Sequence, residues 1–211
     1  MQVGFRLDSC SELPPFQSVV PITGFVTSLR CVPLRVGAEL PRKNRSVAPG
    51  EAAHGGDMTF RIQGLPAESF QPLFSMTDTE LAARGAVRRI ADGRPVYPCR
   101  ISLTDAAEGD EVILVHFEHH AVDSPYRASH AIYVRRGETQ YDAVDQIPAQ
   151  LKTRLLSVRA FDKHGMLVAA EVIDGDKLEA TIGTLFAEPR TDYLHVHYAR
   201  PGCYAARITR S

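Results

Sequence analysis

The chain has 211 residues, of which 44% are hydrophobic and 23% are charged, and its formal net charge at pH 7 is −1. This composition predicts a globular chain with one substantial domain. The near-zero charge argues against nucleic acid and against an anionic membrane surface as partners, because proteins that bind either usually carry an excess of Lys and Arg.

The apolar run near the N-terminus, residues 16–29, predicts neither a membrane span nor a signal peptide. Pro21 and Gly24 interrupt it, and it is too short to cross a bilayer. Asp8 and Glu12 stand where a signal peptide would be basic. The cysteines show no C-x-x-C spacing, which favours reduced thiols over a zinc site or a disulfide framework. They are Cys10, Cys31, Cys99 and Cys203. We therefore expect a cytoplasmic protein.

Residues 1–57 differ from the rest of the chain in pattern. They contain scattered prolines and no sustained period of 2 or 3.6, whereas "MTFRIQGL" from Met58 alternates like a first strand. Two explanations stay open: a disordered tail, or a mis-assigned reading frame whose true start is Met58. We expect residues 58–211 to form a single α+β domain.

The first half of this domain shows a helix start and a pair of strands. Thr77 and Glu80 have the spacing of a capping box and predict a helix over residues 80–90. The segment "EVILVHFEHH", residues 111–120, is apolar on both faces and predicts an inner strand, which residues 129–136 follow as a second strand. The residues expected to share a face are Ile113, Val115, Phe117 and His119 on the first strand, and His130, Ile132 and Val134 on the second.

The second half begins with a predicted helix at Pro148 that carries Leu151 and Leu155 on one face. The segments "LLSVRAF" and "MLVAAEVI" predict a hairpin, with Asp162 bonding the turn backbone and Gly165 in the left-handed conformation.

A second capping box, Asp176 with Glu179, predicts a helix that ends before Pro189. Its apolar stripe consists of Leu178, Ile182, Leu185 and Phe186. With the closing hairpin, residues 193–208, these elements predict an α+β fold: a mostly antiparallel sheet built from hairpins, with a few short helices.

The chain from Met58 to Ser211 resembles a bacterial family known as domain-of-unknown-function family 1203. The segments that carry the resemblance are "FRIQGLPA", "PCRISLTDA", "SPYRASHAIYVR", "LLSVRAFDKHGM" and "HVHYARPGCYAARI", in this order. The resemblance implies a small intracellular protein. It implies no activity, cofactor or mechanism.

The closing hairpin, "YLHVHYARPGCYAARI", is the predicted site. Matching its apolar faces pairs Leu194 with Ile208, Val196 with Ala206 and Tyr198 with Tyr204. The same register places His195 opposite Arg207, and His197 opposite Ala205 and diagonal to Cys203. Because Pro201 is disfavoured in a tight turn here, we expect a turn of about five residues.

Three kinds of function remain open for this hairpin. The first is binding of a small anionic ligand, for which imidazole and guanidinium groups supply donors. The predicted ligand-binding residues are His195, His197, Arg207, Arg127, His130 and Cys99, and Arg100 and Arg159 would add donors if they converge. The second is an enzyme with a Cys203–His197 pair or a metal–histidine centre. The third is an interaction module that pairs through its edge strands.

For a metal, the two strand histidines would need a third ligand such as Cys203, with Cys99, His119 or His130 completing the shell. Arg207 beside His195 and the lack of a carboxylate in the hairpin argue against a cation. The sequence therefore predicts no metal ligands, and it leaves the cofactor and the oligomeric state unassigned. His119 and His130 have a simpler explanation as hydrogen-bonded core residues.

Overall fold

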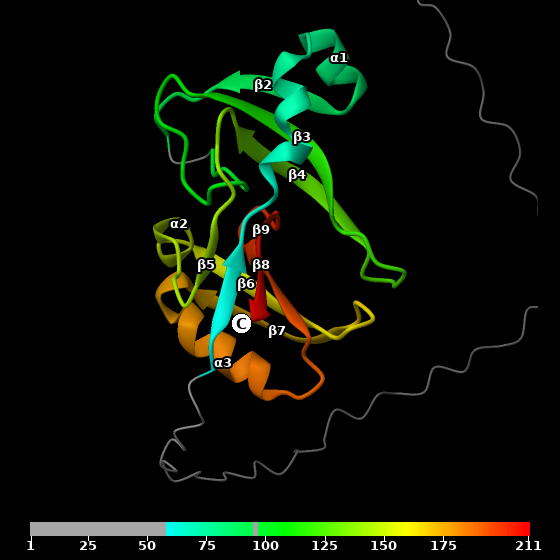
Figure 1. Cartoon of the computed structure of the whole chain (residues 1–211), viewed down its shortest axis with the longest axis vertical. Coiled ribbons are helices and arrows are strands. Elements are labelled where there is room, and N and C mark those ends of the chain that lie inside the picture. The colour runs from blue at the N-terminus through cyan, green and yellow to red at the C-terminus, as the bar shows by residue number, and fades with distance from the viewer. Residues whose placement is uncertain (1–57, 95–96) are drawn as a thin grey trace, which may run out of the picture. The chain divides into compact units, whose positions relative to one another are not determined.

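The computed structural model describes residues 58–94 and 97–211 (Figure 1). The predictions for residues 1–57 lie outside the described residues. Between Met58 and Ser211 the structure has two antiparallel sheets with short helices, which confirms the predicted α+β class.

The larger sheet has six strands in the order β5-β1-β9-β8-β6-β7, and every pair of neighbours is antiparallel. Its strands are β1 (Phe60–Gln63), β5 (Asp142–Val144), β6 (Leu155–Phe161), β7 (Leu167–Asp174), β8 (Tyr193–Tyr198) and β9 (Tyr204–Arg210). The predicted β6–β7 hairpin is confirmed: Asp162 Oδ1 accepts the backbone N–H groups of His164 and Met166, and Gly165 has a φ of +75°.

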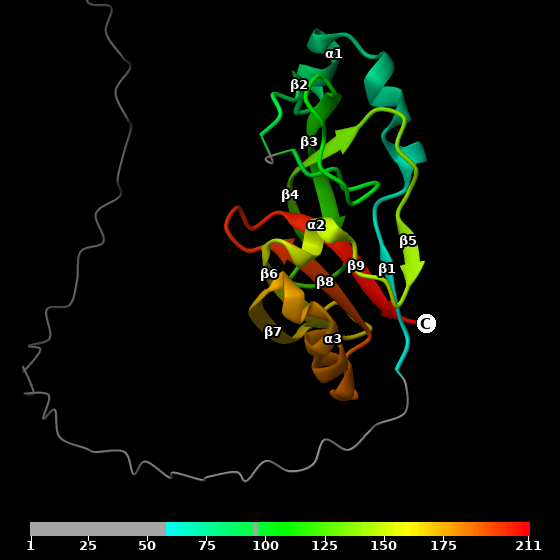
Figure 2. The ribbon, with the colours of Figure 1, turned by 90° about the vertical axis from the view of Figure 1, so that its left-hand side faces the viewer.

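The smaller sheet has three strands in the order β2-β3-β4: β2 (Ala86–Ile90), β3 (Glu111–His120) and β4 (Ala128–Arg135). β3 is its inner strand, as its apolar pattern predicts. Figure 1 shows this sheet above the larger one, and Figure 2 shows β1 and β5 on one side of the larger sheet with β6 and β7 on the other.

The first predicted helix is right at its start and wrong at its end. Thr77 caps α1 (Asp78–Ala83), and the reciprocal bond with Glu80 forms the expected capping box. The helix then stops, because Gly85 takes a φ of +66°, and Ala86–Ile90 forms β2 instead of helical turns. Two short 3₁₀ helices precede it: η1 (Ala67–Ser69) and η2 (Gln71–Ser75).

The helix predicted at Pro148 is a single turn, α2 (Ala149–Lys152). Leu151 is buried, but Leu155 is the first residue of β6 and is 40% exposed, so its predicted place on the helix is wrong. The chain leaves the helix before Leu155 and pairs with β7, and Leu156 fills the core instead.

The second predicted capping box is also wrong. A 3₁₀ turn, η3 (Gly175–Lys177), runs directly into α3 (Leu178–Ala187), and neither helix has a side-chain cap. The turn packs so closely on α2 that a Cβ at Gly175 would lie 1.9 Å from the carbonyl oxygen of Leu151. This contact places Asp176 inside the turn, where its side chain does not cap α3. The end of the helix before Pro189 is confirmed.

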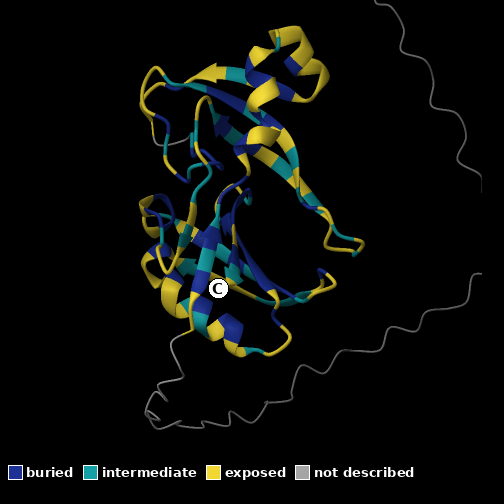
Figure 3. Ribbon diagram, in the orientation of Figure 1, coloured by how far each residue is buried: buried dark blue, intermediate teal, exposed yellow. Residues whose placement is uncertain are grey.

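Two main buried clusters cover the two faces of the β8–β9 hairpin. The apolar stripe of α3 packs on one face, and its predicted members, Leu178, Ile182, Leu185 and Phe186, are all buried there. Tyr204 on the other face joins the cluster formed by the three-stranded sheet and the segment before β2. All six residues of β8 are therefore buried, which appears as dark blue ribbon at the centre of Figure 3.

Candidate functional site

The last hairpin has the predicted register over half its length. Leu194 pairs with Ile208, His195 with Arg207 and Val196 with Ala206. The connection from Tyr198 to Tyr204 leaves five residues between the strands, as expected.

Beyond Val196 the predicted register is wrong. His197 pairs with Tyr204, because Ala205 is an extra residue on β9 and forms a β-bulge. The predicted pairing of His197 with Ala205, and of Tyr198 with Tyr204, therefore does not form.

The bulge separates Cys203 from the histidines. Cys203 packs in the cluster that α3 covers, and its Sγ accepts a hydrogen bond from Arg100 Nη2 at 2.9 Å. His197 Nδ1 instead bonds the carbonyl oxygen of Gly202 at 3.1 Å, and its Nε2 has no partner among the described residues. The predicted Cys203–His197 proton-transfer pair is thus not formed in this structure.

A third histidine takes the place expected for the thiol. His119, His195 and His197 each offer one ring nitrogen to a group whose members all lie within 4.8 Å of one another. The His119 ring lies 5.1 Å from the His197 ring and stacks on Tyr204 at the same centroid distance, with 12° between the planes of the stacked pair. Tyr204, which the β9 bulge turns toward this face, forms one wall of the cluster.

A second β-bulge brings His119 into position. On β3, Glu118 pairs with Ser129 and His120 pairs with Ala128, so His119 is the extra residue. In a regular strand, consecutive side chains point to opposite faces. Here both His119 and His120 contact His195 of β8.

His120 supports the cluster without joining it. Its Nδ1 lies 2.8 Å from the carbonyl oxygen of Tyr126, and its Nε2 lies 2.7 Å from the Tyr193 hydroxyl. Since a carbonyl only accepts, Nδ1 donates and Nε2 accepts the hydroxyl proton. Both nitrogens are therefore satisfied, and His120 ties the end of β3 to β8.

The three clustered rings are neutral near pH 7. Burial lowers the pKa of His195 to about 2 and that of His197 to about 3. Burial also lowers the pKa of His119, to about 4, with the neighbouring His120 as a further cause. Arg159 adds a positive charge that disfavours protonation of His119 and His197.

Each ring of the cluster has one buried nitrogen with no hydrogen-bond partner within residues 58–94 and 97–211: Nδ1 of His119, Nδ1 of His195 and Nε2 of His197. The state of His197 follows from its other nitrogen, because Nδ1–H must donate to the Gly202 carbonyl. Its Nε2 therefore carries a free lone pair. Buried polar atoms without partners are rare in folded proteins, and each one requires an explanation.

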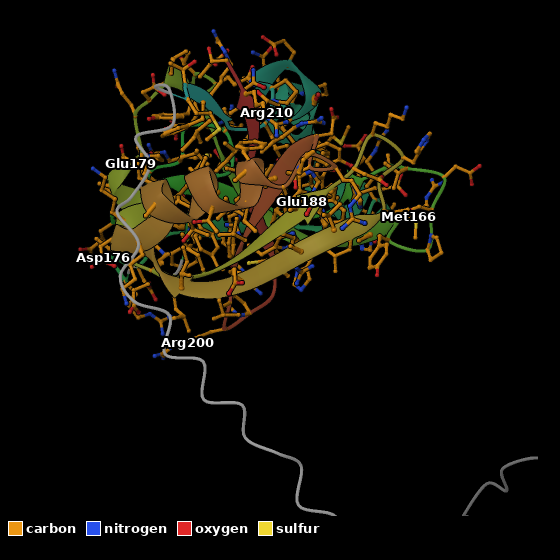
Figure 4. The ribbon with its side chains drawn as sticks, turned by 90° about the horizontal axis from the view of Figure 1, so that it is seen from below. Met166, Asp176, Glu179, Glu188, Arg200 and Arg210 are labelled. Atoms are coloured by element: carbon orange, nitrogen blue, oxygen red, sulfur yellow. The ribbon has the colours of Figure 1, made fainter. Side chains whose placement is uncertain are left out.

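A separate pocket of about 660 Å³ lies beside the turn of the same hairpin. It is lined by Pro98, Arg100, His130, Ala131, Tyr133, Thr153, Arg154, Leu155, Tyr198, Arg200, Pro201 and Cys203. These lining residues include three arginines and a histidine, and none of them is acidic. Figure 4 shows Arg200 at the outer end of the loop between β8 and β9.

Arg100 is the buried cation of this pocket, with only 1% of its surface exposed. Its guanidinium donates to the carbonyl oxygens of Tyr204 and Pro98 and to Cys203 Sγ. None of these three partners is a carboxylate. Of five guanidinium N–H groups, three are therefore used by these contacts.

Arg154 is the second guanidinium at the pocket, and Asp105 is the carboxylate that partly offsets the charge. Arg154 Nη2 lies 2.7 Å from Asp105 Oδ1. The guanidinium carbons of Arg100 and Arg154 lie 4.9 Å and 5.2 Å from the centroid of the Tyr198 ring. The Tyr198 hydroxyl donates to Gln150 Oε1.

The residues predicted for one site are divided among several places. His130 lines the pocket, as does Cys203, while His195 and His197 belong to the histidine cluster. The other three lie apart: Cys99 is in the core beside the three-stranded sheet, Arg127 pairs with Glu118, and Arg207 stacks over Tyr193.

Sequence reasoning did not select Arg154 and Arg200 for the pocket. Arg200 stands directly before the Pro–Gly turn, which is a local signal for an exposed cation near the hairpin end. No local pattern marks Arg154 as a pocket residue. The predicted helix extends to Leu155 and so includes Arg154, whereas α2 ends at Lys152.

The two antiparallel sheets, the histidine cluster and the arginine-lined pocket define an α+β protein with two polar sites at its last hairpin. The family model described as "Protein of unknown function (DUF1203)" matches residues 96–210, and the chain therefore belongs to that family. This match begins later in the chain than the resemblance from Met58. No curated protein and no solved structure matches the chain. Within the described residues, no helix is long and apolar enough to cross a membrane.

Proposed function

We propose that the protein binds a small anionic ligand, such as a phosphate or a carboxylate, in the arginine-lined pocket. The observation that carries the proposal is the set of lining residues, with Arg100, Arg154, Arg200 and His130 and no Asp or Glu. The volume, about 660 Å³, lies in the range of small-molecule sites.

The arginines differ in the part they play. Arg100 is buried and holds its positive charge among carbonyl and sulfur acceptors, where low solvent exposure strengthens its attraction for an anion. Arg200 is exposed and forms no ion pair within the described part of the chain, so its guanidinium is able to fold over a ligand and bind it bidentately. Arg154 is held by Asp105 and positions the Tyr198 ring.

The proposal changes the predicted ligand-binding set. Of its six residues only His130 lines the pocket, where Arg154 and Arg200 take the place of Arg207 and Arg127 as cationic groups. Cys203, which the sequence offered as a catalytic candidate, lines the pocket as well. We also infer a cytoplasmic location, in which the pocket cysteine stays reduced.

Thermal unfolding of the full-length chain in phosphate, compared with chloride at equal ionic strength, tests the proposal. A ligand at about 100 times its Kd stabilises the folded state by about 2.7 kcal/mol. We expect phosphate to raise the Tm of the wild type and of Arg127→Ala, and to lose this effect in Arg200→Ala. Both arginines are exposed, so neither substitution disturbs the core.

A second readout uses Cys203, which faces the same pocket. Bound phosphate should slow its alkylation by iodoacetate, an anion of similar charge. Equal stabilisation of Arg200→Ala and the wild type, or no stabilisation by phosphate, sulfate or a small dicarboxylate, would contradict the proposal.

A second candidate is a thiol enzyme that acts on the bound anion. The contact of Arg100 Nη2 with Cys203 Sγ favours it, because a guanidinium stabilises negative charge that develops on sulfur during a reaction. The third alternative, an interaction module, has one supporting feature: the edge strand β7 exposes 65% of Val172.

A further inference from the structure

We propose that His119, His195 and His197 form a binding site for one divalent transition-metal ion of the zinc type. None of these three histidines lines the arginine-lined pocket, so this proposal does not depend on the proposed anion site.

The first argument is convergence. Three ring nitrogens, from the end of β3 and from two positions of β8, lie within 4.8 Å of one another. Zinc–nitrogen bonds of about 2.0–2.1 Å in a tetrahedral arrangement bring ligand nitrogens to within about 3.4 Å of one another. Binding of the ion therefore requires the ring nitrogens to move closer together by up to about 1.4 Å.

The second argument is the hydrogen-bond state of the rings. A buried nitrogen on each of the three histidines has no partner among the described residues, and a metal ion is a partner for each of these nitrogens that faces it. The Gly202 carbonyl holds His197 in the tautomer whose Nε2 is able to ligate. Such a bond from the second ring nitrogen to a carbonyl is the usual support of a ligating histidine.

The third argument is the irregular backbone that forms the cluster. Two β-bulges, at His119 and at Ala205, turn His119 and Tyr204 toward the cluster. Bulges interrupt the hydrogen-bond ladder and are over-represented next to functional sites.

The donor set selects the class of ion. Three imidazoles suit zinc, copper, nickel or iron, whereas magnesium and calcium require oxygen ligands, which the cluster lacks. With three protein ligands, a fourth coordination position is left for water or a small molecule, as in catalytic zinc sites. His195 and His197 are buried, and the half-buried His119 is the side from which the ion enters.

The positive groups around the cluster favour one charge for the fourth ligand of the metal ion. Arg159 and Arg207 both raise the local positive potential. The Arg207 guanidinium, whose charge argued against a metal, lies over the Tyr193 ring at 4.1 Å from its centroid. These cations disfavour the bare ion and favour an anionic fourth ligand such as hydroxide or a carboxylate.

Zinc binding to the untagged full-length chain, first freed of metal with a chelator, tests the site. We expect about one equivalent of Zn²⁺ by elemental mass spectrometry, together with a rise in Tm. Loss of a ligand in His119→Ala should weaken zinc binding by more than the 10- to 100-fold that loss of an outer partner costs. His116→Ala is the matched control, since His116 is an exposed histidine on the same strand and should bind zinc as the wild type does.

The absorption spectrum of bound Co²⁺ tests the site even if His119→Ala does not fold. Co²⁺ in the wild-type site should give the visible absorption of a low-symmetry site, without a sulfur charge-transfer band in the near ultraviolet. His119→Cys should add that band, because a thiolate then ligates the ion. Substoichiometric zinc in the wild type, unchanged zinc affinity in His119→Ala, or a cobalt spectrum that His119→Cys does not alter would overturn the proposal.

Discussion

The contribution of the Tyr198 side chain to the stability of the fold depends on its protonation state. Burial raises the pKa of its phenol above the ordinary value, and the nearby Arg100 and Arg154 offset this rise only in part. The neutral hydroxyl donates to Gln150 Oε1, which an ionised phenolate is unable to do. The folded state therefore requires Tyr198 to be protonated.

We expect the stability that depends on Tyr198 to be lost at high pH. A group whose pKa is raised in the folded state contributes fully below its unfolded pKa, about 10 for tyrosine, and loses this contribution as the pH rises above it. At neutral pH, Tyr198→Phe leaves Gln150 Oε1 unpaired and should cost about 1–3 kcal/mol.

The measurement is urea unfolding of the wild type and Tyr198→Phe at a series of pH values. The difference in unfolding free energy should narrow above pH 10 by up to about 1.4 kcal/mol per pH unit, because only the wild type has this group to titrate. A constant difference between pH 8 and pH 12 would show that Tyr198 ionises as readily in the folded state as in the unfolded state.

At the scale of the element, β6 begins where a helical spacing of leucines predicts a helix. Leu151 and Leu155 are four residues apart, a spacing that predicts one helical face. The structure ends α2 after a single turn and begins β6 at Leu155, where period 2 decides which side chains are buried. Leu156 is then fully buried and Leu155 is 40% exposed.

The two neighbouring leucines are a matched pair for a stability test. Leu156→Ala removes a fully buried side chain and should cost about 2–5 kcal/mol. Leu155→Ala should cost less than about 1 kcal/mol, because much of this side chain is already in water. Urea unfolding midpoints, compared at a common m-value, measure both. A helix that extended through Leu155 would reverse the order of the two effects.

At the scale of the whole molecule, the boundary of the family match differs from the boundary of the fold. The match starts at residue 96, but β1 lies before it and pairs with both β5 and β9 in the larger sheet. Phe60 and Ile62 are core residues of that sheet, and the segment from Leu65 to Leu81 supplies much of the second cluster. The fold therefore requires residues that precede the match.

Three chain lengths test this boundary by thermal unfolding: the full chain, residues 58–211, and residues 96–211. We expect residues 58–211 to unfold cooperatively at nearly the Tm of the full chain, since the three core clusters lie within this segment. Residues 96–211 should show no cooperative transition, because the strand between β5 and β9 is missing. A cooperative transition in the shortest chain, or a large loss of Tm in residues 58–211, would contradict this view of the domain.

Much of the fold was predictable because it depends on local sequence. A run that is apolar on both faces predicted β3, the apolar segments on either side of a turn predicted β6 and β7, and alternation predicted β8. The Thr77–Glu80 spacing predicted the start of α1. The errors arose where close packing overrides a local pattern. At Gly175 the chain approaches α2 too closely for a side chain, and no spacing within residues 174–179 encodes that contact.

The sequence by itself determined the α+β class, most of the hairpins and the central register of β8 with β9, because alternation of polar and apolar residues acts over a few neighbours. Tertiary structure alone decided which side chains meet at the two sites. Arg100 and Cys203 are 103 residues apart in the chain, and His119 reaches His197 only through a bulge in β3. Such contacts depend on how the two sheets pack against each other, which local alternation does not encode.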